Sequence, residues 1–253
     1  MSDRTATDLV TVQDEGPVRA VRINRPDKKN ALTGPMYQAM TRAVDGAAND
    51  GVRCVVILGT PVGFCAGNDL EEFLAVAKSG RRDYHGAGFL KSLARSSVPL
   101  VAGVQSVAVG VGTTMLLHCD YVVAGANARF STPFVALGLV PEAGSSLLAP
   151  RLMGHRRAFA TLAMGRLLDA AAAMACGLVN AVTPPEQVDA DALKAANEIA
   201  ALPPQAVAAT RKLLRGPPDE ILTRIDEEVA VFDERLTSPE ARAAFEAFLS
   251  RKR

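Results

Sequence analysis

Short apolar runs alternate with amphipathic segments through the first half of the chain. Residues 9–14 and 18–23 have the pattern of paired β-strands, and Glu15-Gly16-Pro17 between them predicts a hairpin turn. Residues 35–49 carry apolar side chains at helical spacing. The apolar run VRCVVIL at 52–58 predicts a buried strand. A hairpin, a helix and a strand therefore open the chain.

The same kinds of segment recur after residue 98. Residues 99–104 have strand character, residues 112–119 have helical character, and residues 120–124 return to a strand pattern. A short further strand is expected at 128–131. This alternation of strands and helices predicts the α/β fold class.

Alanine-rich helical segments dominate the chain from His155 onward. Proline pairs separate some of them, at 184–185, 203–204 and 217–218. The predicted helices span roughly 155–164, 169–176, 187–200, 204–214, 219–235 and 239–250. We therefore expect residues 1–190 to form the core, and residues 191–253 to form a helical region that packs on this core or on a neighbouring subunit.

Composition narrows the classes of protein. The chain has 253 residues, of which 49% are hydrophobic and 22% charged, as in globular proteins with a large core. The formal net charge of +1 provides no field that would attract nucleic acid or an anionic membrane. Tryptophan is absent and aromatic residues make up 5%, which disfavours a surface for stacking bases. Any partner is therefore expected to be recognised by a local site.

The spacing of the cysteines bears on metal binding, and the first residues of the chain bear on its location in the cell. The four cysteines form no CxxC pair and have no histidine at zinc-site spacing, so we expect buried thiols and no metal. Residues 1–16 are polar and acidic, unlike a signal or transit peptide. The longest apolar stretch, at 98–111, is interrupted by proline, glycine and polar residues. These features predict a cytoplasmic protein with no membrane span.

Two segments in the first third of the chain suit the binding of anions. NRPDKKNALT at 24–33 places two lysines in a turn before a helix, where phosphates can bind, but a helix start with exposed lysines has the same pattern. GFCAGNDL at 63–70 follows a strand, and its small residues let a ligand approach the backbone amides. An ordinary tight strand-to-helix turn uses similar residues.

A third segment, AVGVGTTM at 108–115, combines glycines with a helix start. Met115 stands where a dinucleotide fingerprint has its third glycine, which argues against a Rossmann site. Free amides at a glycine-flanked helix start suit a developing oxyanion. Close packing of the helix against a neighbour accounts for the glycines equally well.

The fourth segment, TPFVALGLVPEAGSS at 132–146, contains Glu142 among apolar residues. Apolar surroundings disfavour the ionised carboxylate and raise its pKa toward the range useful for proton transfer. An acidic residue in the first turn of a helix is the simpler explanation. The sequence has no G-x-S-x-G, HExxH or phosphate-loop motif, and its three histidines lie in separate segments, which disfavours a catalytic triad.

Taken together, these segments resemble the crotonase superfamily, the enoyl-CoA hydratase/isomerase family. The resemblance covers essentially the whole chain. It rests on blocks characteristic of the family: NRPDKKNALT, VVILGTPVGFCAGNDL, VPLVAGVQSVAVGVG, CDYVVAGANARFSTP and LGLVPEAGSS. It implies an α/β crotonase-type (ClpP/crotonase) spiral of repeated ββα units. It further implies a helical C-terminal region for trimerisation, and assembly as a homotrimer or a dimer of trimers.

The resemblance also implies a site for acyl-CoA thioesters within residues 1–190. By position, the backbone amides of Asn68 and Val111 hold the thioester oxygen as it becomes an enolate. Coenzyme A belongs to the substrate, and no separate cofactor is expected. The acyl tail is expected to meet Phe73, Phe89, Phe134 or Leu137. The residues implied to border CoA and the acyl group are Lys28, Lys29, Ala31, Leu32, Ala66, Gly67, Asn68, Asp69, Leu70, Gly110, Phe134 and Leu137.

The acid/base residues distinguish the activities within this family. Hydratases of the family use two glutamates to hold water, and the matching positions here are Thr114 and Phe134, which cannot transfer a proton as a carboxylate does. Glu142 matches the single catalytic glutamate of the monofunctional 3,2-enoyl-CoA isomerases. The resemblance therefore implies an isomerase that moves a proton from C2 to C4. Hydration or another crotonase-type acyl-CoA reaction remains an alternative, as does acyl-CoA binding without catalysis.

Overall fold

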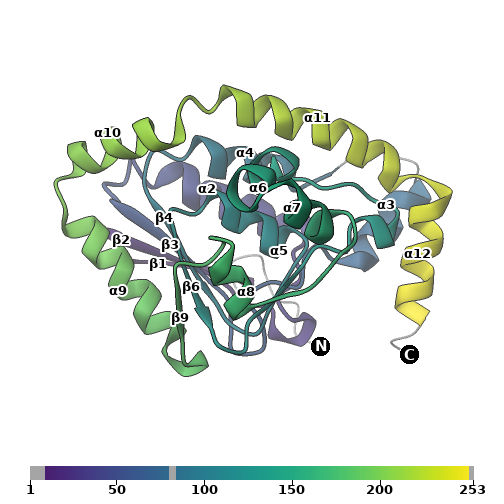
Figure 1. Cartoon of the computed structure of the whole chain (residues 1–253), viewed down its shortest axis with the longest axis horizontal. Helices are drawn as coiled ribbons and strands as arrows, with labels where there is room; N and C mark the ends of the chain where they lie inside the picture. Colours follow the sequence, from purple (N-terminus) through teal and green to yellow (C-terminus); the bar gives the residue numbers. More distant parts are fainter. Residues whose placement is uncertain (1–8, 80–83, 251–253) are drawn as a thin grey trace.

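The computed structural model describes residues 9–79 and 84–250. Its main sheet has six strands, of which only the first pair, β1 and β2, is antiparallel. The expected hairpin is thus confirmed, and the following strands are buried because helices cover both faces of the sheet (Figure 1). In sheet order the strands are β1 (Val10–Glu15), β2 (Val18–Ile23), β3 (Cys54–Leu58), β4 (Leu100–Val104), β6 (Tyr121–Gly125) and β9 (Ala181–Thr183).

A second, three-stranded sheet continues the chain beyond the main sheet. Two strands of the main sheet are each followed by a strand of the second sheet and then by helical turns. An isolated parallel bridge between Cys65 and Ala108 adds the segment after β3 to the same layer. This is the expected spiral of ββα units. The strands are β5 (Val107–Val109), β7 (Arg129–Ser131) and β8 (Leu168–Asp169).

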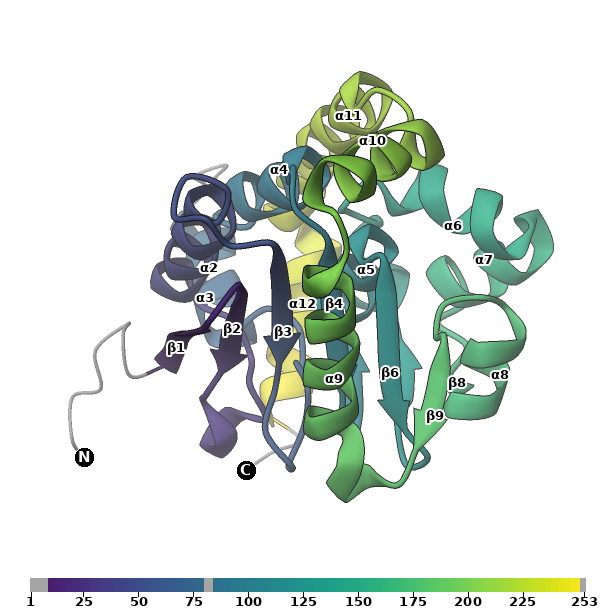
Figure 2. The same cartoon turned by 90° about the vertical axis from the view of Figure 1, so that its left-hand side faces the viewer.

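Helices cover the two faces of the main sheet unequally. On one face, α9 (Val188–Ala201) lays a stripe of small residues, Ala192, Ala196 and Ala200, against β3, β4 and β6 (Figure 2). The other face carries the larger core, beneath α2 (Gly34–Gly46) and α4 (Ala87–Arg95). The remaining helical segments of this half are η1 (Pro26–Lys28), α3 (Leu70–Ser79), α5 (Val111–Thr114), η2 (Met115–His118), η3 (Val135–Leu137), α6 (Ser145–Met153), α7 (His155–Leu162), α8 (Ala170–Ala175) and η4 (Pro185–Gln187).

The C-terminal helices form an outer layer. After α9, helices α10 (Pro204–Arg215) and α11 (Asp219–Leu236) arch over α2, α4 and α6, and α12 (Pro239–Ser250) descends along α3 (Figure 1). The boundary expected between residues 190 and 191 falls inside α9. Because α9 packs on the sheet, the outer helical layer begins only after it.

The cysteines, the helix lengths and the metal-ligating side chains bear on the predictions from composition. All four cysteines are free thiols, three of them buried and Cys119 partly buried. Among residues 9–79 and 84–250, no helix is both long and apolar enough to cross a bilayer. In the same part of the chain, no three metal-ligating side chains gather in one place.

Candidate active site

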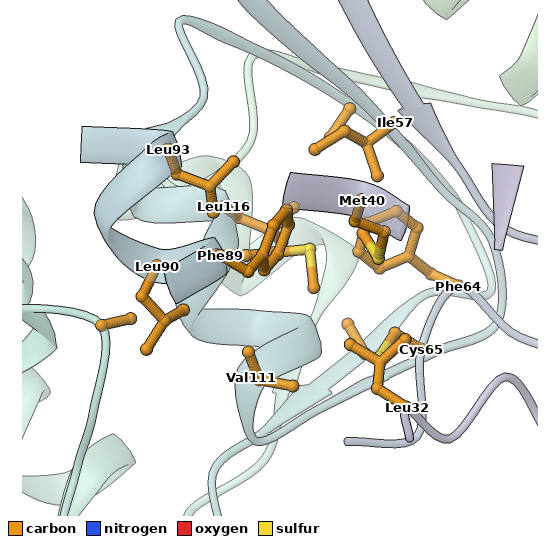
Figure 3. Close-up of a cluster of buried hydrophobic side chains, with 14 of the residues drawn as sticks. Leu32, Met40, Ile57, Phe64, Cys65, Phe89, Leu90, Leu93, Val111 and Leu116 are labelled. Atoms are coloured by element: carbon orange, nitrogen blue, oxygen red, sulfur yellow. The ribbon is translucent and has the colours of Figure 1, made fainter. Parts of the chain in front are cut away.

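Two loops that follow strands β3 and β4 lie against each other and form the floor of the site. The amides of Phe64 and Cys65 donate to the Val107 carbonyl at 3.0 and 3.1 Å, and the Val109 amide donates back to Cys65 at 2.8 Å. The side chain of Val111 points into the core cluster together with Cys65 and Leu32 (Figure 3). The core thus anchors both loops from below.

Glycines bring the ends of these loops into contact. Gly67 has φ +90°, and a Cβ there would lie 3.0 Å from the Val109 carbonyl oxygen. Gly110 has φ 55° and ψ −121°, a backbone conformation that other residues avoid. An ideal Cβ on Gly110 would lie 3.9 Å from Cα of Gly67. Because Asn68 and Val111 come directly after these glycines, their backbone amides belong to neighbouring turns.

The segment at residues 24–33 is fixed beside the first loop. Asn30 is fully buried, and its amide nitrogen donates to the Gly63 carbonyl at 2.7 Å. The Ala66 amide donates to the Lys29 carbonyl at 3.0 Å, and the Leu32 amide donates to the Gly67 carbonyl at 2.8 Å. These bonds bring segments 24–33 and 63–70 together, as expected of one binding site.

A carboxyl group with two hydroxyl partners is linked to the second loop through Thr114, whose hydroxyl lies 3.3 Å from the Gly110 carbonyl. Glu142 is completely buried, and its Oε2 accepts a hydrogen bond from the Tyr84 hydroxyl at 2.7 Å. Its Oε1 is bound by the hydroxyl of Thr114, on α5. Both partners are neutral, and the described residues include no cation paired with Glu142. Each carboxylate oxygen is therefore oriented without a counter-charge.

These surroundings change the acidity of Glu142. Burial raises its pKa to about 7, against the smaller lowering effects of the Thr114 and Tyr84 hydroxyls, and the charge of Glu228 adds to the rise. Burial also raises the pKa of Tyr84 well above its usual value, so that its hydroxyl remains a donor. Glu142 can consequently gain or lose a proton near neutral pH.

Distant segments hold the turn that carries Glu142. Ala143 and Gly144 both have left-handed backbones, with φ of 68° and 67°, which is a strained conformation for Ala143. The Glu228 carboxylate on α11 accepts from the amides of Gly144 at 2.6 Å and Ser146 at 2.8 Å, where α6 begins. His118 Nε2 donates to the Ala143 carbonyl at 2.7 Å, and burial lowers the pKa of this histidine to about 4. Neutral His118 and buried Glu228 thus fix the turn from two sides.

An apolar cavity of about 370 Å³ opens on the floor of the site. It lies beneath helices α11 and α12, and none of the described residues that line it has a carboxylate. Glu142 is not among the lining residues. A narrow recess that includes Tyr37 and Tyr84 shares Asn68 and Phe73 with the cavity. The cavity is lined by Ala66, Gly67, Asn68, Leu70, Phe73, Val109, Gly110, Pro133, Phe134, Ala136, Leu137, Leu139, Phe232, Ala244, Ala247 and Phe248.

The structure gives different roles to some of the residues expected at a CoA site. Phe89 is fully buried in the core and does not line the cavity (Figure 3). The Leu32 side chain is also in the core, and its backbone amide and carbonyl are bonded to Gly67 and Asp69. The Asp69 carboxylate binds Arg25 at 2.6 Å and the Glu71 amide at 2.8 Å, which makes it a structural group at the start of α3.

Other expected residues lie where a ligand can reach them. Lys28 and Lys29 are exposed beside Ala31, and Lys28 pairs with Glu71 at 3.1 Å. Most of the remaining expected residues line the cavity, namely Ala66, Gly67, Asn68, Leu70, Gly110, Phe134 and Leu137.

Four side chains around Glu142 escaped the sequence analysis: Tyr37, Tyr84, His118 and Glu228. The Tyr37 hydroxyl donates to Oδ1 of Asn68 at 2.6 Å, and its ring lies 6.3 Å from that of Tyr84. The available signal was scarcity, because these two residues are among only three tyrosines in the chain. Nothing in the local sequence links His118 or Glu228 to residue 142.

Comparison with known proteins identifies the family to which the chain is similar. The enoyl-CoA hydratase/isomerase family pattern matches residues 13–253. The chain is 34% identical to enoyl-CoA delta isomerase 2 of Rattus norvegicus, covering 96% of this chain but only 64% of that longer protein. It is 30% identical to the short-chain-enoyl-CoA hydratase of Clostridium acetobutylicum, covering 96% of this chain and 95% of that protein. The solved structure of Pseudomonas aeruginosa OdaA has a TM-score of 0.90 and 41% identity, covering 96% and 99% of the two chains.

Proposed function

The chain belongs to the enoyl-CoA hydratase/isomerase family, and within it we propose that this protein is a 3,2-enoyl-CoA isomerase. One observation carries the proposal: Glu142 is a buried carboxyl group oriented by two hydroxyls, one of them from Thr114 on the short helix that follows Gly110 of the cavity lining. None of the described residues that line this cavity has a carboxylate. Isomerisation requires one base that serves two carbon atoms. It requires no bound water and no second carboxylate.

The proposed reaction moves one proton. Ionised Glu142 removes a proton from C2 of a 3-enoyl-CoA, and the electron pair spreads over a dienolate. The protonated carboxyl then returns a proton to C4, which leaves the conjugated 2-enoyl-CoA and restores the carboxylate. A pKa of about 7 suits both steps, because the group is a competent base and, once protonated, a competent acid near neutral pH.

The backbone amides of Asn68 and Val111 are proposed to stabilise the dienolate oxygen. Support comes from the contact between their two glycine turns. Within the described residues, neither amide donates to another backbone carbonyl. One donor aimed at a developing oxyanion is typically worth about 2.7–4 kcal/mol.

The cavity and the exposed lysines suggest how an acyl-CoA binds. An apolar acyl chain fits the cavity of about 370 Å³, whose lining is mostly aromatic and aliphatic. Lys28 and Lys29 are placed to meet the phosphates of CoA, with the adenine along the backbone of residues 66–70. CoA enters as part of the substrate, and no further cofactor is proposed.

Hydration is the second candidate, favoured by the similarity to a short-chain-enoyl-CoA hydratase. Two observations weigh against it. Thr114 binds Glu142 directly and has no carboxylate with which to activate water. Phe134 places an aromatic ring on the cavity wall. Hydration would need a second acidic group to help Glu142 hold the water, and neither Thr114 nor Phe134 supplies one.

We also propose that the protein assembles as a homotrimer or as two stacked trimers. Helix α10 contains no buried residue, and Leu213 and Leu214 on it are 86% and 82% exposed. Contact with another copy would remove these leucines from water. The solution mass, compared with that of three 26.6 kDa chains, tests this proposal.

The activity is tested by incubating the purified protein with a medium-chain 3-enoyl-CoA and, separately, with the matching 2-enoyl-CoA. An isomer of unchanged mass that co-elutes with the 2-enoyl-CoA supports the isomerase, and Glu142→Gln should lower its rate at least ~100-fold. Rapid formation of a product heavier by one water would refute the proposal in favour of hydration. Full isomerase activity in Glu142→Gln would refute the role of Glu142.

A further inference from the structure

Beyond the base itself, we infer that Tyr84 is the residue that positions Glu142 and keeps it ionisable inside the core. The inference rests on the proposed isomerase function and adds to it a second side chain on which the reaction depends. It starts from the direct hydrogen bond of 2.7 Å between the Tyr84 hydroxyl and Oε2 of Glu142. Both residues are buried, with 5% and 0% of their surfaces exposed.

The ring of Tyr84 is held by aromatic neighbours from three elements. Its centroid lies 4.7 Å from Phe232 on α11, 6.3 Å from Phe73 on α3 and 6.3 Å from Tyr37 on α2. A ring enclosed in this way has little rotational freedom, so the direction of its hydroxyl is set by packing. The hydrogen bond to Tyr84 therefore fixes the orientation of the Glu142 carboxyl group.

Gly86 provides a second, independent observation. An ideal Cβ at this position would lie 2.4 Å from both Cζ and the hydroxyl oxygen of Tyr84, far inside contact distance. The backbone at Gly86 is ordinary, with φ −75°, so backbone conformation does not require glycine there. The absent side chain leaves room for the hydroxyl end of Tyr84. Residues 84 and 86 thus act together.

A neutral hydroxyl suits this role better than a cation. The Glu142 carboxylate must be desolvated to act as a base near the cavity, yet it must still ionise at neutral pH. A lysine or arginine partner would lower its pKa strongly and make it a weak base. A hydroxyl bond to an ionised group stabilises it by an amount equivalent to roughly one pH unit. Tyr84 and Thr114 each supply one such bond.

Three other titratable groups around Glu142 have pKa values far from 7. The pKa of His118 on η2 falls to about 4, whereas burial raises the pKa of Cys65 to about 12 and that of Tyr37 on α2 well above its usual value. Within residues 9–79 and 84–250, Glu228 on α11 is the carboxyl group whose charge raises the pKa of Glu142, and its bonds to Gly144 and Ser146 do not involve Tyr84. A change confined to variants of Tyr84 or Gly86 therefore reports on Glu142.

The test compares pH profiles of isomerase kcat/KM for the wild type, Tyr84→Phe and Gly86→Ala. Both variants should shift the acidic limb upward by about one pH unit, so that activity at pH 6 falls roughly tenfold. The matched controls are Tyr121→Phe, in β6, and Gly88→Ala, where a new Cβ meets nothing within 4 Å. Neither control should move the limb.

An unshifted limb in Tyr84→Phe, even with a lower rate at every pH, would overturn the inference, because a merely structural role has that effect. If the wild type has no isomerase activity, the proposed function fails, but the inference remains testable. The carboxyl group of Glu142 can then be titrated by infrared difference spectroscopy, with Glu142→Gln identifying its band. An equal midpoint in the wild type and Tyr84→Phe would overturn the inference independently of catalysis.

Discussion

Replacing Glu142 by glutamine should stabilise the protein at alkaline pH while it removes the proposed base. In the folded chain the pKa of Glu142 is about 7, against 4.5 for a free side chain. Between these values the folded chain holds one proton more than the unfolded chain. The free energy of unfolding of the wild type therefore falls as the pH rises through this window. Glutamine cannot ionise, and the hydroxyls of Thr114 and Tyr84 can rotate to bond its amide.

The size of the effect follows from the two pKa values. The difference between about 7 and 4.5 corresponds to roughly 3 kcal/mol, most of which falls between pH 5 and pH 8. His118 acts in the opposite direction, because its lowered pKa costs stability as the pH falls below 6.5. That contribution is common to both proteins and cancels when the variant is compared with the wild type.

Urea unfolding at pH 5, 6, 7 and 8 measures the difference. Far-ultraviolet circular dichroism is the suitable signal, because the chain contains no tryptophan. The advantage of Glu142→Gln over the wild type should grow by about 2–3 kcal/mol across this range. Glu227→Gln, at an exposed carboxylate on α11, is the control and should show no such growth. Parallel curves for Glu142→Gln and the wild type would show that Glu142 titrates as an ordinary surface group, which refutes the reasoning.

Two further predictions concern the turn after Glu142 and the cavity proposed for the acyl chain. Glu228→Gln should lower the free energy of unfolding by about 2–3 kcal/mol and reduce kcat, because the new NH₂ group would face the amide of Gly144 or Ser146. A free energy of unfolding, measured with urea, within about 0.5 kcal/mol of the wild type would contradict this prediction. Ala244→Phe should fill part of the acyl cavity and lower kcat/KM roughly tenfold or more for long chains, leaving short chains nearly unaffected. The control is Ala243→Phe, on the same helix but not among the lining residues. An equal loss of kcat/KM for all acyl chain lengths in Ala244→Phe would argue against the assignment of this cavity to the acyl chain.

Much of the fold follows from local patterns. The hairpin, the buried strands and the C-terminal helices form close to the predicted residues, because each has an apolar periodicity that its packing uses. Shorter elements were missed: β5, β8 and β9 have two or three residues and carry no periodicity. Helix α4 was also missed, although its buried side is continuous in the structure. These elements owe their conformation to tertiary contacts more than to local sequence.

Some residues of the candidate site could likewise be predicted from the sequence, and others could not. Its glycine turns and Glu142 lie in contiguous motifs, which the sequence displays directly. The partners of Glu142 are 28 residues distant in Thr114 and 58 in Tyr84. Glu228 holds the following turn across 84 residues. No periodicity or motif connects such positions, because their meeting depends on how the spiral and the outer helices close around one another.

Part of the proposed catalytic apparatus lies in the outer helices. Glu228 and Phe232 are two separate contributions of α11: the first holds the turn after Glu142, and the second packs against the ring of Tyr84. The two residues are four apart and therefore lie on the same face of the helix. A single displacement of α11 would loosen the turn and the hydroxyl donor together. The C-terminal helices, which sequence composition suggested as a region for packing and assembly, are thus also physically coupled to the acidity and orientation of the Glu142 carboxyl group.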